Sequence, residues 1–295
     1  MILVTGAAGL SGSIVMREFA RKGIPVRGLV RSRARAEALQ GLPGVETVEG
    51  NMLRPETLQG AFDGVDQALM ISSSGAQMVD TQCTFIDAAK KAGLKRIVKF
   101  SGAESGVGFE AKNFRFTRMH EEIERYLERS GIAWTHLRPS QFMQMYFRDA
   151  PSIIKSAAIF QAWGDTKLSP VDLEDVAKVA LGLLTTNGHE GRSYDMTGPE
   201  ALTMPQVAEK ISEAIDRPIR YVNISAFEKR QAMLNAGVPE YFADAMDELA
   251  SERRRLTESR VDLSAHEIFG VKPTTFAEFA LKYAAVFRGD ATLKQ

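Results

Sequence analysis

Three glycines near the start of the chain have the spacing and setting of a phosphate-binding turn. Gly6, Gly9 and Gly12 follow the apolar segment MILVT and open a segment with helical periodicity. Glycine permits the tight turn, the close approach of backbone to a pyrophosphate and the packing of helix on strand, although a bare tight turn also uses glycine. The helix N-terminus adds unpaired N–H groups. We therefore predict a dinucleotide site with contacts from Thr5, Gly6, Ala8, Gly9, Leu10, Ser11 and Gly12.

The residues after the second apolar segment indicate which dinucleotide is bound. The segment at 24–30 is followed by Arg31, Ser32 and Arg33, with no carboxylate to accept from the ribose hydroxyls of NAD. Arg31 can donate to the 2′-phosphate of NADP and stack on adenine. We expect NADPH in preference to NADH, and an ordinary surface arginine is the alternative.

Other candidate residues follow the later apolar segments, because ligands of parallel sheets lie at the carboxyl ends of strands. Asn51 suits the edge of adenine, since an amide both donates and accepts. The remaining predicted cofactor contacts are Met52, Ser72, Ser73, Ser101, Gly102, Pro139 and Phe142. The predicted substrate contacts are Ser140, Gln141, Met143 and Tyr146. Aromatic and methionine side chains after residue 139 suit a flat aromatic substrate, and core packing between two lobes is the alternative.

These residues need a sheet to bring them together. Apolar segments without polar alternation are typical of parallel strands buried on both faces, and here they alternate with helical patterns. We predict a Rossmann-type, doubly wound parallel α/β sheet over residues 1–138 and a smaller C-terminal α/β substrate lobe over 139–295. The predicted strands are MILVT, 24–30, 45–48, 65–71, 95–100 and 133–138, and the predicted helices are 12–22, 33–40, 55–62, 76–92 and 113–130. In the second half we predict helices at 172–186, after Thr203 and over 226–258, and strands at RSYDMTG and IRYVNIS.

The composition excludes several classes of protein. Lys plus Arg equals Asp plus Glu at 37 each, so we expect no nucleic-acid partner. Cys83 is the only cysteine, which excludes an intrachain disulfide and favours a reducing compartment. It lies among apolar residues at helical spacing, so we expect it to pack in the core. His136, His189 and His266 lack ligand spacing, so we expect no metal. The chain shows neither a basic leader nor a long apolar run, so we expect a cytoplasmic protein without membrane contact, with a homodimer as one option for its assembly.

Several motifs together resemble the NmrA-like atypical short-chain dehydrogenase/reductases. The resemblance covers nearly the whole chain and is carried by VTGAAGLSG, LVRS, GNMLRPETL, KRIVKFSG, the His120–Glu124 pair, GIAWTHLRPSQFMQ, YDMTGPEALT and GVKPTTFAEFALKYAAVF. Within this family the sequence is most similar to the quinone oxidoreductase, azoreductase and triphenylmethane reductase branches. In these branches a histidine, here His120, stands where plant ether reductases have a lysine. This resemblance implies the fold and an NAD(P)H-dependent oxidoreductase. The group also contains co-repressors and redox sensors, so a non-catalytic NAD(P)-sensing regulator is the alternative.

The stretch FTRMH, residues 116–120, occupies the place of the Tyr-x-x-x-Lys motif of the wider superfamily. Phe116 has no proton to give, and loss of a general acid costs roughly 10²–10⁴ in rate. Quinones, azo compounds and cationic dyes depend less on that acid, because hydride addition gives a stabilised anion or a neutral product. His120 shares a helix face with Phe116, Ile123 and Leu127, and we predict that it orients the acceptor or donates a proton. A core histidine bonded, for example, to Ser101 is the alternative. We therefore predict an NADPH-dependent oxidoreductase that passes hydride to a quinone or similar electron-poor aromatic.

Overall fold

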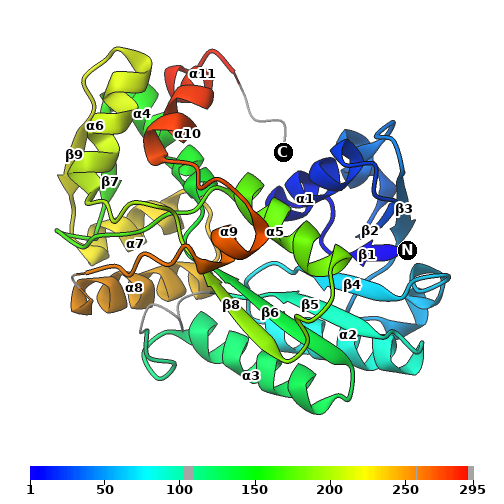
Figure 1. The fold of residues 1–295 in the computed structure, drawn as a ribbon. Helices are drawn as coiled ribbons and strands as arrows, with labels where there is room; N and C mark the ends of the chain where they lie inside the picture. The colour runs from blue at the N-terminus through cyan, green and yellow to red at the C-terminus, as the bar shows by residue number, and fades with distance from the viewer. Residues whose placement is uncertain (103–108, 257, 292–295) are drawn as a thin grey trace.

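A parallel sheet forms the centre of the protein. The computed structural model describes residues 1–102, 109–256 and 258–291, and in them the sheet has seven strands in the order β3-β2-β1-β4-β5-β6-β8 (Figure 1). Each neighbouring pair is parallel. The order reverses beside β1, where doubly wound folds open a crevice for ligands. The strands are β1 (Ile2–Val4), β2 (Val26–Val30), β3 (Val45–Glu49), β4 (Gln67–Met70), β5 (Arg96–Phe100), β6 (Ala133–Pro139) and β8 (Arg192–Met196).

Helices cover both faces of this sheet, which explains why central strands such as β1 and β5 are buried along their whole length. The helices α1 (Leu10–Arg21), α5 (Leu173–Thr185) and α9 (Ser264–Phe269) lie on one face and share a core with it (Figure 1). The helices α2 (Met78–Lys91) and α3 (Arg115–Arg129) lie on the other face with a second core. The prediction of a Rossmann-type doubly wound sheet is confirmed.

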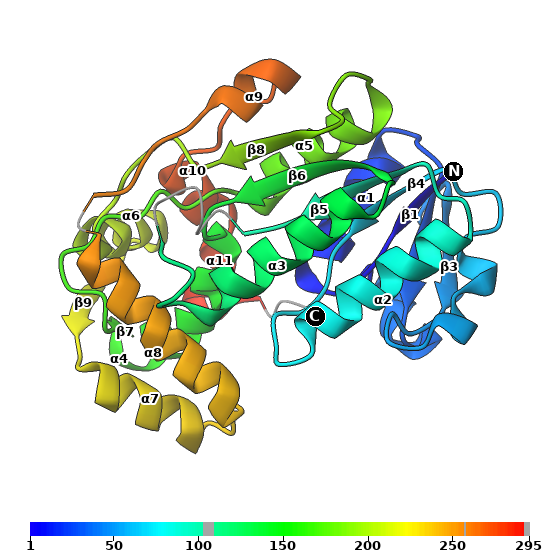
Figure 2. The same ribbon diagram turned by 90° about the horizontal axis from the view of Figure 1, so that it is seen from below.

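A smaller group of elements lies beyond the carboxyl ends of β6 and β8 and has a core of its own (Figure 2). It contains a parallel pair of strands, β7 with β9. Its elements are η4 (Met143–Asp149), α4 (Ala150–Ser156), β7 (Ala158–Gln161), α6 (Met204–Ile215), β9 (Arg220–Asn223), α10 (Phe276–Lys282) and α11 (Ala284–Arg288). Thr203 caps α6 in a reciprocal capping box with Gln206, as the sequence predicts.

The structure departs from the predicted elements in three places. The strand predicted at RSYDMTG does not belong to the second lobe, because β8 pairs with β6 and extends the central sheet. The division into two domains at residue 138 stays a prediction, although β8 shows that residues after 138 also contribute to the central sheet. The helices predicted at 33–40 and 55–62 are instead short 3-10 turns, namely η1 (Arg33–Leu39), η2 (Pro55–Thr57) and η3 (Gln59–Ala61).

The third departure is the long helix predicted over 226–258, which is divided in two. The first part, α7 (Ala226–Asn235), ends before Gly237, whose φ of +77° is left-handed. The second part, α8 (Glu240–Arg255), begins directly after Pro239, which lacks an N–H to continue a helix. Residue 257, and residues 292–295 of the predicted lobe, lie outside the described residues.

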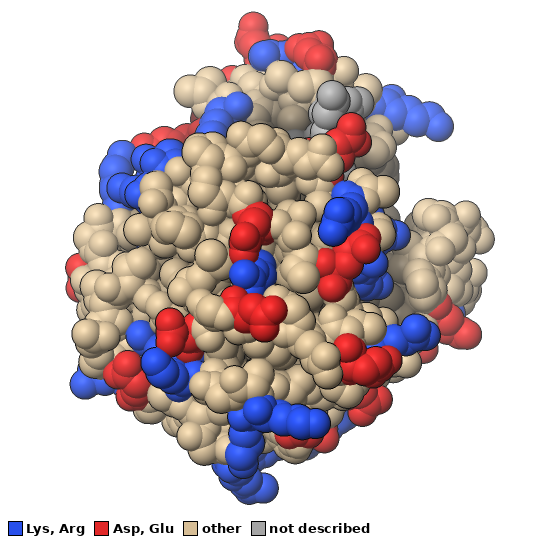
Figure 3. All heavy atoms as spheres, turned by 90° about the vertical axis from the view of Figure 1, so that its right-hand side faces the viewer, with Lys and Arg blue, Asp and Glu red and all other residues tan. Residues whose placement is uncertain are grey.

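The surface carries both signs of charge. Basic and acidic side chains alternate across the face shown in Figure 3, as expected from the equal numbers of the two. None of the helices in the described ranges has the length and apolar character that crossing a bilayer requires.

Candidate active site at the carboxyl edge of the sheet

The turn between β1 and α1 has the backbone geometry of an anion cradle. Gly6 has a φ of +60°, and an added Cβ there would lie 3.0 Å from the carbonyl oxygen of Ile71. A Cβ on Gly12 would lie 2.2 Å from the Gly6 carbonyl oxygen, so only glycine fits. Gly9 is the N-cap of α1, whose first turn contains no acidic residue. The N–H groups of the first turn lack helical partners, so this turn fits the pyrophosphate of a dinucleotide.

Thr5 supports this cradle from beneath. Its hydroxyl donates to the carbonyl oxygen of Ile71 at 2.6 Å and accepts from the Ile71 N–H at 2.8 Å. These two bonds link the end of β1 to the end of β4. Because Thr5 is fully buried, its side chain is not exposed to a ligand. Ala8 packs against the core, whereas Leu10 is exposed. The contacts predicted for Thr5 and Ala8 would therefore come from their backbone groups.

Arg31 ends β2 with an exposed side chain, and the described residues provide no hydrogen bond or ion pair to its guanidinium. The carboxylate next to this turn is Glu49, at the end of β3, which sequence reasoning did not consider. Its Oε1 accepts from the Arg33 N–H at 2.7 Å. That bond engages the carboxylate with η1, while Arg31 remains available to an anion.

The predicted adenine contact, Asn51, already uses one of its atoms. Its Oδ1 accepts from the N–H of Leu53 at 3.0 Å, so its Nδ2 remains as the donor. Met52 is buried in the core on the α2 side of the sheet. Ser72 accepts from Gln82 at 2.8 Å, which fixes the loop after β4.

The ends of β5 and β6 and the inner face of α3 hold a connected polar network. The ammonium of Lys99 lies 2.8 Å from His120 Nδ1 and 3.0 Å from Ser101 Oγ. Ser101 Oγ donates to Glu124 Oε1 at 2.6 Å, and Arg138 donates to both oxygens of Glu124 at 3.0 and 2.5 Å. The sequence-based alternative paired His120 with Ser101, but Ser101 Oγ is 3.4 Å from Nδ1, so Lys99 is the closer partner.

Burial and the positive charges of this network favour the neutral form of His120. Burial, followed by the positive charges of Lys99 and Arg138, holds the pKa of His120 well below its usual value. Burial opposes ionisation of Glu124, but the hydrogen bonds from Arg138 and Ser101 and the nearby positive groups hold its pKa below the ordinary value. No hydrogen bond to His120 Nε2 occurs in the described part of the chain, and the residue is only partly buried. His120 therefore offers Nε2 to a ligand.

Lys99 is the residue that sequence reasoning missed. It is fully buried in β5, where a charge in the run RIVKF is unusual because buried lysines need partners. A lysine within a strand predicted to be buried on both faces was the available signal. Its partners were not readable, because they depend on how β5 and α3 are aligned in space.

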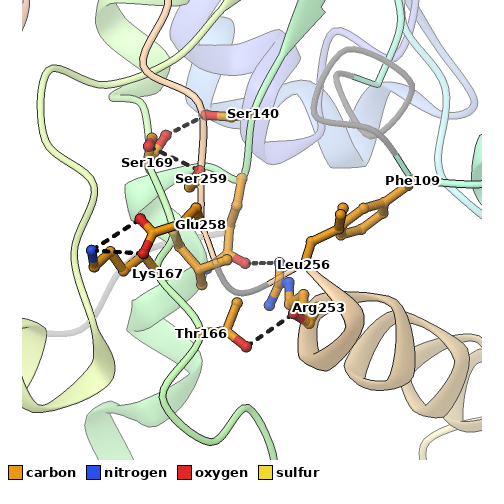
Figure 4. A pocket seen from close by; sticks show the side chains of 11 residues that line it. Phe109, Ser140, Thr166, Lys167, Ser169, Arg253, Leu256, Glu258 and Ser259 are labelled. Atoms are coloured by element: carbon orange, nitrogen blue, oxygen red, sulfur yellow. Dashed lines mark hydrogen bonds and ion pairs between the residues drawn. The ribbon is translucent and has the colours of Figure 1, made fainter.

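A pocket lies beyond the end of β6 and includes two of the predicted substrate residues. Ser140 donates to the carbonyl oxygen of Ser169 at 2.6 Å, and Gln141 accepts from Arg253. Figure 4 shows Phe109 and Arg253 at this pocket, with the Lys167–Glu258 ion pair on another wall. The lining residues are Phe109, Ser140, Gln141, Thr166, Lys167, Leu168, Ser169, Arg253, Leu256, Glu258 and Ser259.

Two other predicted substrate residues belong to the lobe's core. Met143 and Tyr146 are each about 1% exposed and pack with the elements of the smaller lobe. The hydroxyl of Tyr146 contacts Met204 Sδ at 3.9 Å. Burial favours the core interpretation for both, whereas Phe142 is only partly buried and lies 5.9 Å, ring to ring, from Phe100.

Cys83 and the histidines other than His120 provide neither a reactive thiolate nor a metal site. Cys83 is partly buried against the core, and burial, followed by nearby carboxylates, raises the pKa of its thiol to about 11, which disfavours the reactive thiolate. Within the described ranges no three His, Cys, Asp or Glu side chains gather as a metal site.

The fold and this site define a dinucleotide-binding protein with its cradle at the switch point of a doubly wound sheet. The family model described as NmrA-like family matches residues 1–280, so the chain belongs to that family. NAD(P)H azoreductase of Xenophilus azovorans is 36% identical over 97% of this chain and 99% of its own. Quinone oxidoreductase 2 of Escherichia coli strain K12 is 30% identical over 94% and 96%. The solved triphenylmethane reductase of Citrobacter sp., complexed with NADP(H), is 26% identical over 96% of this chain and 100% of that chain, with a TM-score of 0.83.

Proposed function

We propose that this protein reduces a quinone or a similar electron-poor aromatic compound with NADPH. The oxidoreductase class and the nicotinamide cofactor agree with the relatives, which include an NAD(P)H azoreductase, a quinone oxidoreductase and an NADP(H)-bound reductase. Bound NADPH supplies the hydride. The observation that carries the substrate class is the arrangement at 116–120, where His120 is held beside the site as a neutral ring and Phe116 lies in a core.

The chain's residues would hold the dinucleotide along the carboxyl edge. The first-turn N–H groups of α1 receive the pyrophosphate, and Arg31 pairs with the 2′-phosphate as a charge-assisted contact. Asn51 Nδ2 donates to the adenine edge. The phosphate contact at Arg31 gives the preference for NADPH.

The chemistry at the acceptor end does not require a strong acid. Addition of hydride to a quinone gives a hydroquinone monoanion, whose charge spreads over the ring, and water then supplies one proton to complete the hydroquinone. His120 Nε2 can donate a hydrogen bond to the oxygen on which the charge develops. Ketones give a localised alkoxide and would need the acid that Phe116 cannot provide.

The test is steady-state oxidation of NADPH by the purified chain against matched acceptors. A panel of benzoquinones, naphthoquinones and azo compounds, with aliphatic ketones as controls, should give turnover with the aromatic acceptors alone. Tight NADPH binding without turnover on any acceptor would overturn the proposal and favour a dinucleotide sensor.

A further inference from the structure

Glu124 determines the direction of the hydrogen bonds that the described residues make around His120. Glu124 is an ionised carboxylate held by Arg138, so it only accepts. Ser101 has one hydroxyl proton, and it donates that proton to Glu124 at 2.6 Å. Ser101 Oγ must therefore accept at its 3.0 Å contact with Lys99, and it has no proton left for His120.

The Lys99 contact then determines the state of the histidine ring. An ammonium group has donors and no acceptor, so His120 Nδ1, at 2.8 Å, accepts from Lys99 and carries no proton. The proton of the neutral ring is left on Nε2. We infer that Lys99 is a positioning residue that holds His120 in the Nε2–H tautomer, so that this N–H faces the acceptor as a hydrogen-bond donor.

The surrounding charges favour the same state. Lys99 approaches the ring from β5 and Arg138 from β6, and both oppose a positive imidazolium. Glu124 on α3 is paired with Arg138, and Asp195 of β8 lies 3.9 Å from the same guanidinium. His136 of β6 is bonded to Glu128 and not to His120. The carboxylates near the ring are thus engaged by Arg138, and nothing in this group calls for a second proton on His120.

If the protein carries out the proposed reaction, the Nε2–H tautomer also limits what His120 can do in it. A neutral Nε2–H can stabilise negative charge on the acceptor, but loss of its proton would leave an unfavourable imidazolate. His120 therefore polarises the acceptor and transfers no proton, as neutral imidazoles do in other enzymes. A site without a proton donor suits acceptors, such as quinones, whose reduced anions are stable.

The direct test is nitrogen NMR of the full chain labelled with ¹⁵N in its imidazole rings. The chain has four histidines, and His120→Gln identifies the signals of His120 by their loss. We expect an Nε2–H tautomer with no protonation between pH 8 and 6, both without cofactor and with NADP⁺. An Nδ1–H tautomer or an imidazolium at pH 7 in the unmodified protein would overturn the inference, whatever the variants do.

Variants separate positioning from packing. Lys99→Met should allow both tautomers, raise the pKa of the ring, and lower kcat/KM for a quinone by about 3- to 100-fold, the upper end matching loss of one transition-state hydrogen bond. Lys99→Arg keeps a hydrogen-bond donor and should therefore recover part of the Nε2–H tautomer and part of the kcat/KM. Lys90→Met, at an exposed position of α2, is the matched control and should change neither the tautomer of His120 nor the kcat/KM. An unchanged tautomer in folded Lys99→Met would contradict the inference.

A second variant covers the case in which Lys99→Met does not fold. Ser101→Ala removes the link to Glu124 but keeps the Lys99–His120 contact, so the Nε2–H tautomer should persist, and its loss would count against Lys99 as the determinant. Absence of quinone turnover in the unmodified protein would defeat the proposed function and leave the tautomer result standing. Full turnover with the other tautomer would defeat the inference alone.

Discussion

The rings of Phe116 and Phe242 lie 6.0 Å apart, and this contact joins α3 to α8. Phe114 and Tyr241 complete the cluster around Phe116, at ring distances of 5.6 and 6.5 Å. Phe116 is about 5% exposed. The residue at the expected tyrosine position is therefore part of the packing between two helices, and α8 is the element that encloses it.

Restoring the tyrosine should not restore an acid. In Phe116→Tyr the hydroxyl would enter an aromatic cluster, and burying it without a partner should lower the free energy of unfolding by about 1–3 kcal/mol. Urea unfolding measures this loss, and ketone reduction should remain absent while quinone turnover persists. A gain of ketone reductase activity would show that the ring can turn toward the cofactor.

Removal of the Arg31 guanidinium should change the choice of cofactor. Arg31→Ala should raise the KM for NADPH by about 10- to 100-fold, which corresponds to the loss of a hydrogen bond to a charged group, and leave the KM for NADH nearly constant. Arg35→Ala, in the same exposed turn, is the control. An equal rise in the KM for NADPH and for NADH would contradict the assignment of Arg31 to the 2′-phosphate.

A methyl group on Gly12 should close the cradle. Because its Cβ would lie 2.2 Å from a backbone oxygen, Gly12→Ala should cost about 1–3 kcal/mol of stability and weaken NADPH binding. Gly60→Ala, where no atom lies within 4 Å of the added carbon, is the matched control. Calorimetric titration with NADPH measures the binding, and unchanged affinity would place the phosphates elsewhere.

The stability of the protein should fall below about pH 6.5 in part because of His120. The folded ring resists protonation while the unfolded ring accepts it near its ordinary pKa, so the unfolded state binds more protons as the pH falls. The loss from one such ring is up to about 1.4 kcal/mol per pH unit. Urea unfolding between pH 7.5 and 5 should show a smaller decline for His120→Gln than for the unmodified chain, and parallel declines would exclude this contribution.

The wall of the pocket at the end of β6 should affect the acceptor and not the cofactor. Phe109→Ala removes an aromatic face from that wall and should raise the KM for a naphthoquinone by about 3- to 10-fold with little change for NADPH, since aromatic contacts contribute about 0.5–1.5 kcal/mol. Phe227→Ala, at a residue about 70% exposed, is the control. If Phe109→Ala raised the KM for NADPH instead, the pocket would be assigned to the cofactor and not to the acceptor.

The local parts of the site were the predictable parts. Gly6 and Gly12 are required by backbone geometry within one turn, so strand, glycines and helix could be predicted in order. The NmrA-like resemblance and the prediction of an NADPH-dependent oxidoreductase are likewise confirmed. The individual residues assigned to cofactor and substrate stay predictions.

The parts that depend on distant alignment were not predictable. The Lys99–His120 contact joins residues 21 apart on different elements, and the burial of Tyr146 depends on Phe276, whose ring lies 5.1 Å away. The break in the charged helix is different, because Gly237 and Pro239 are local signals for it and the prediction overlooked them.

The addition of β8 to the central sheet has a mechanical consequence. The chain leaves the sheet and its covering helices after β6, returns at α5, leaves again after β8, returns at α8, which packs on α3, and leaves once more before α10. Five separate connections thus join the smaller lobe to the sheet and the helices that cover it, so the lobe cannot swing on a single hinge. Any movement of the smaller lobe should therefore be a small displacement shared among all five connections. A fragment cut at residue 138 would lose β8 from the sheet together with α5 and α9, and only α1 would remain of the three helices on that face.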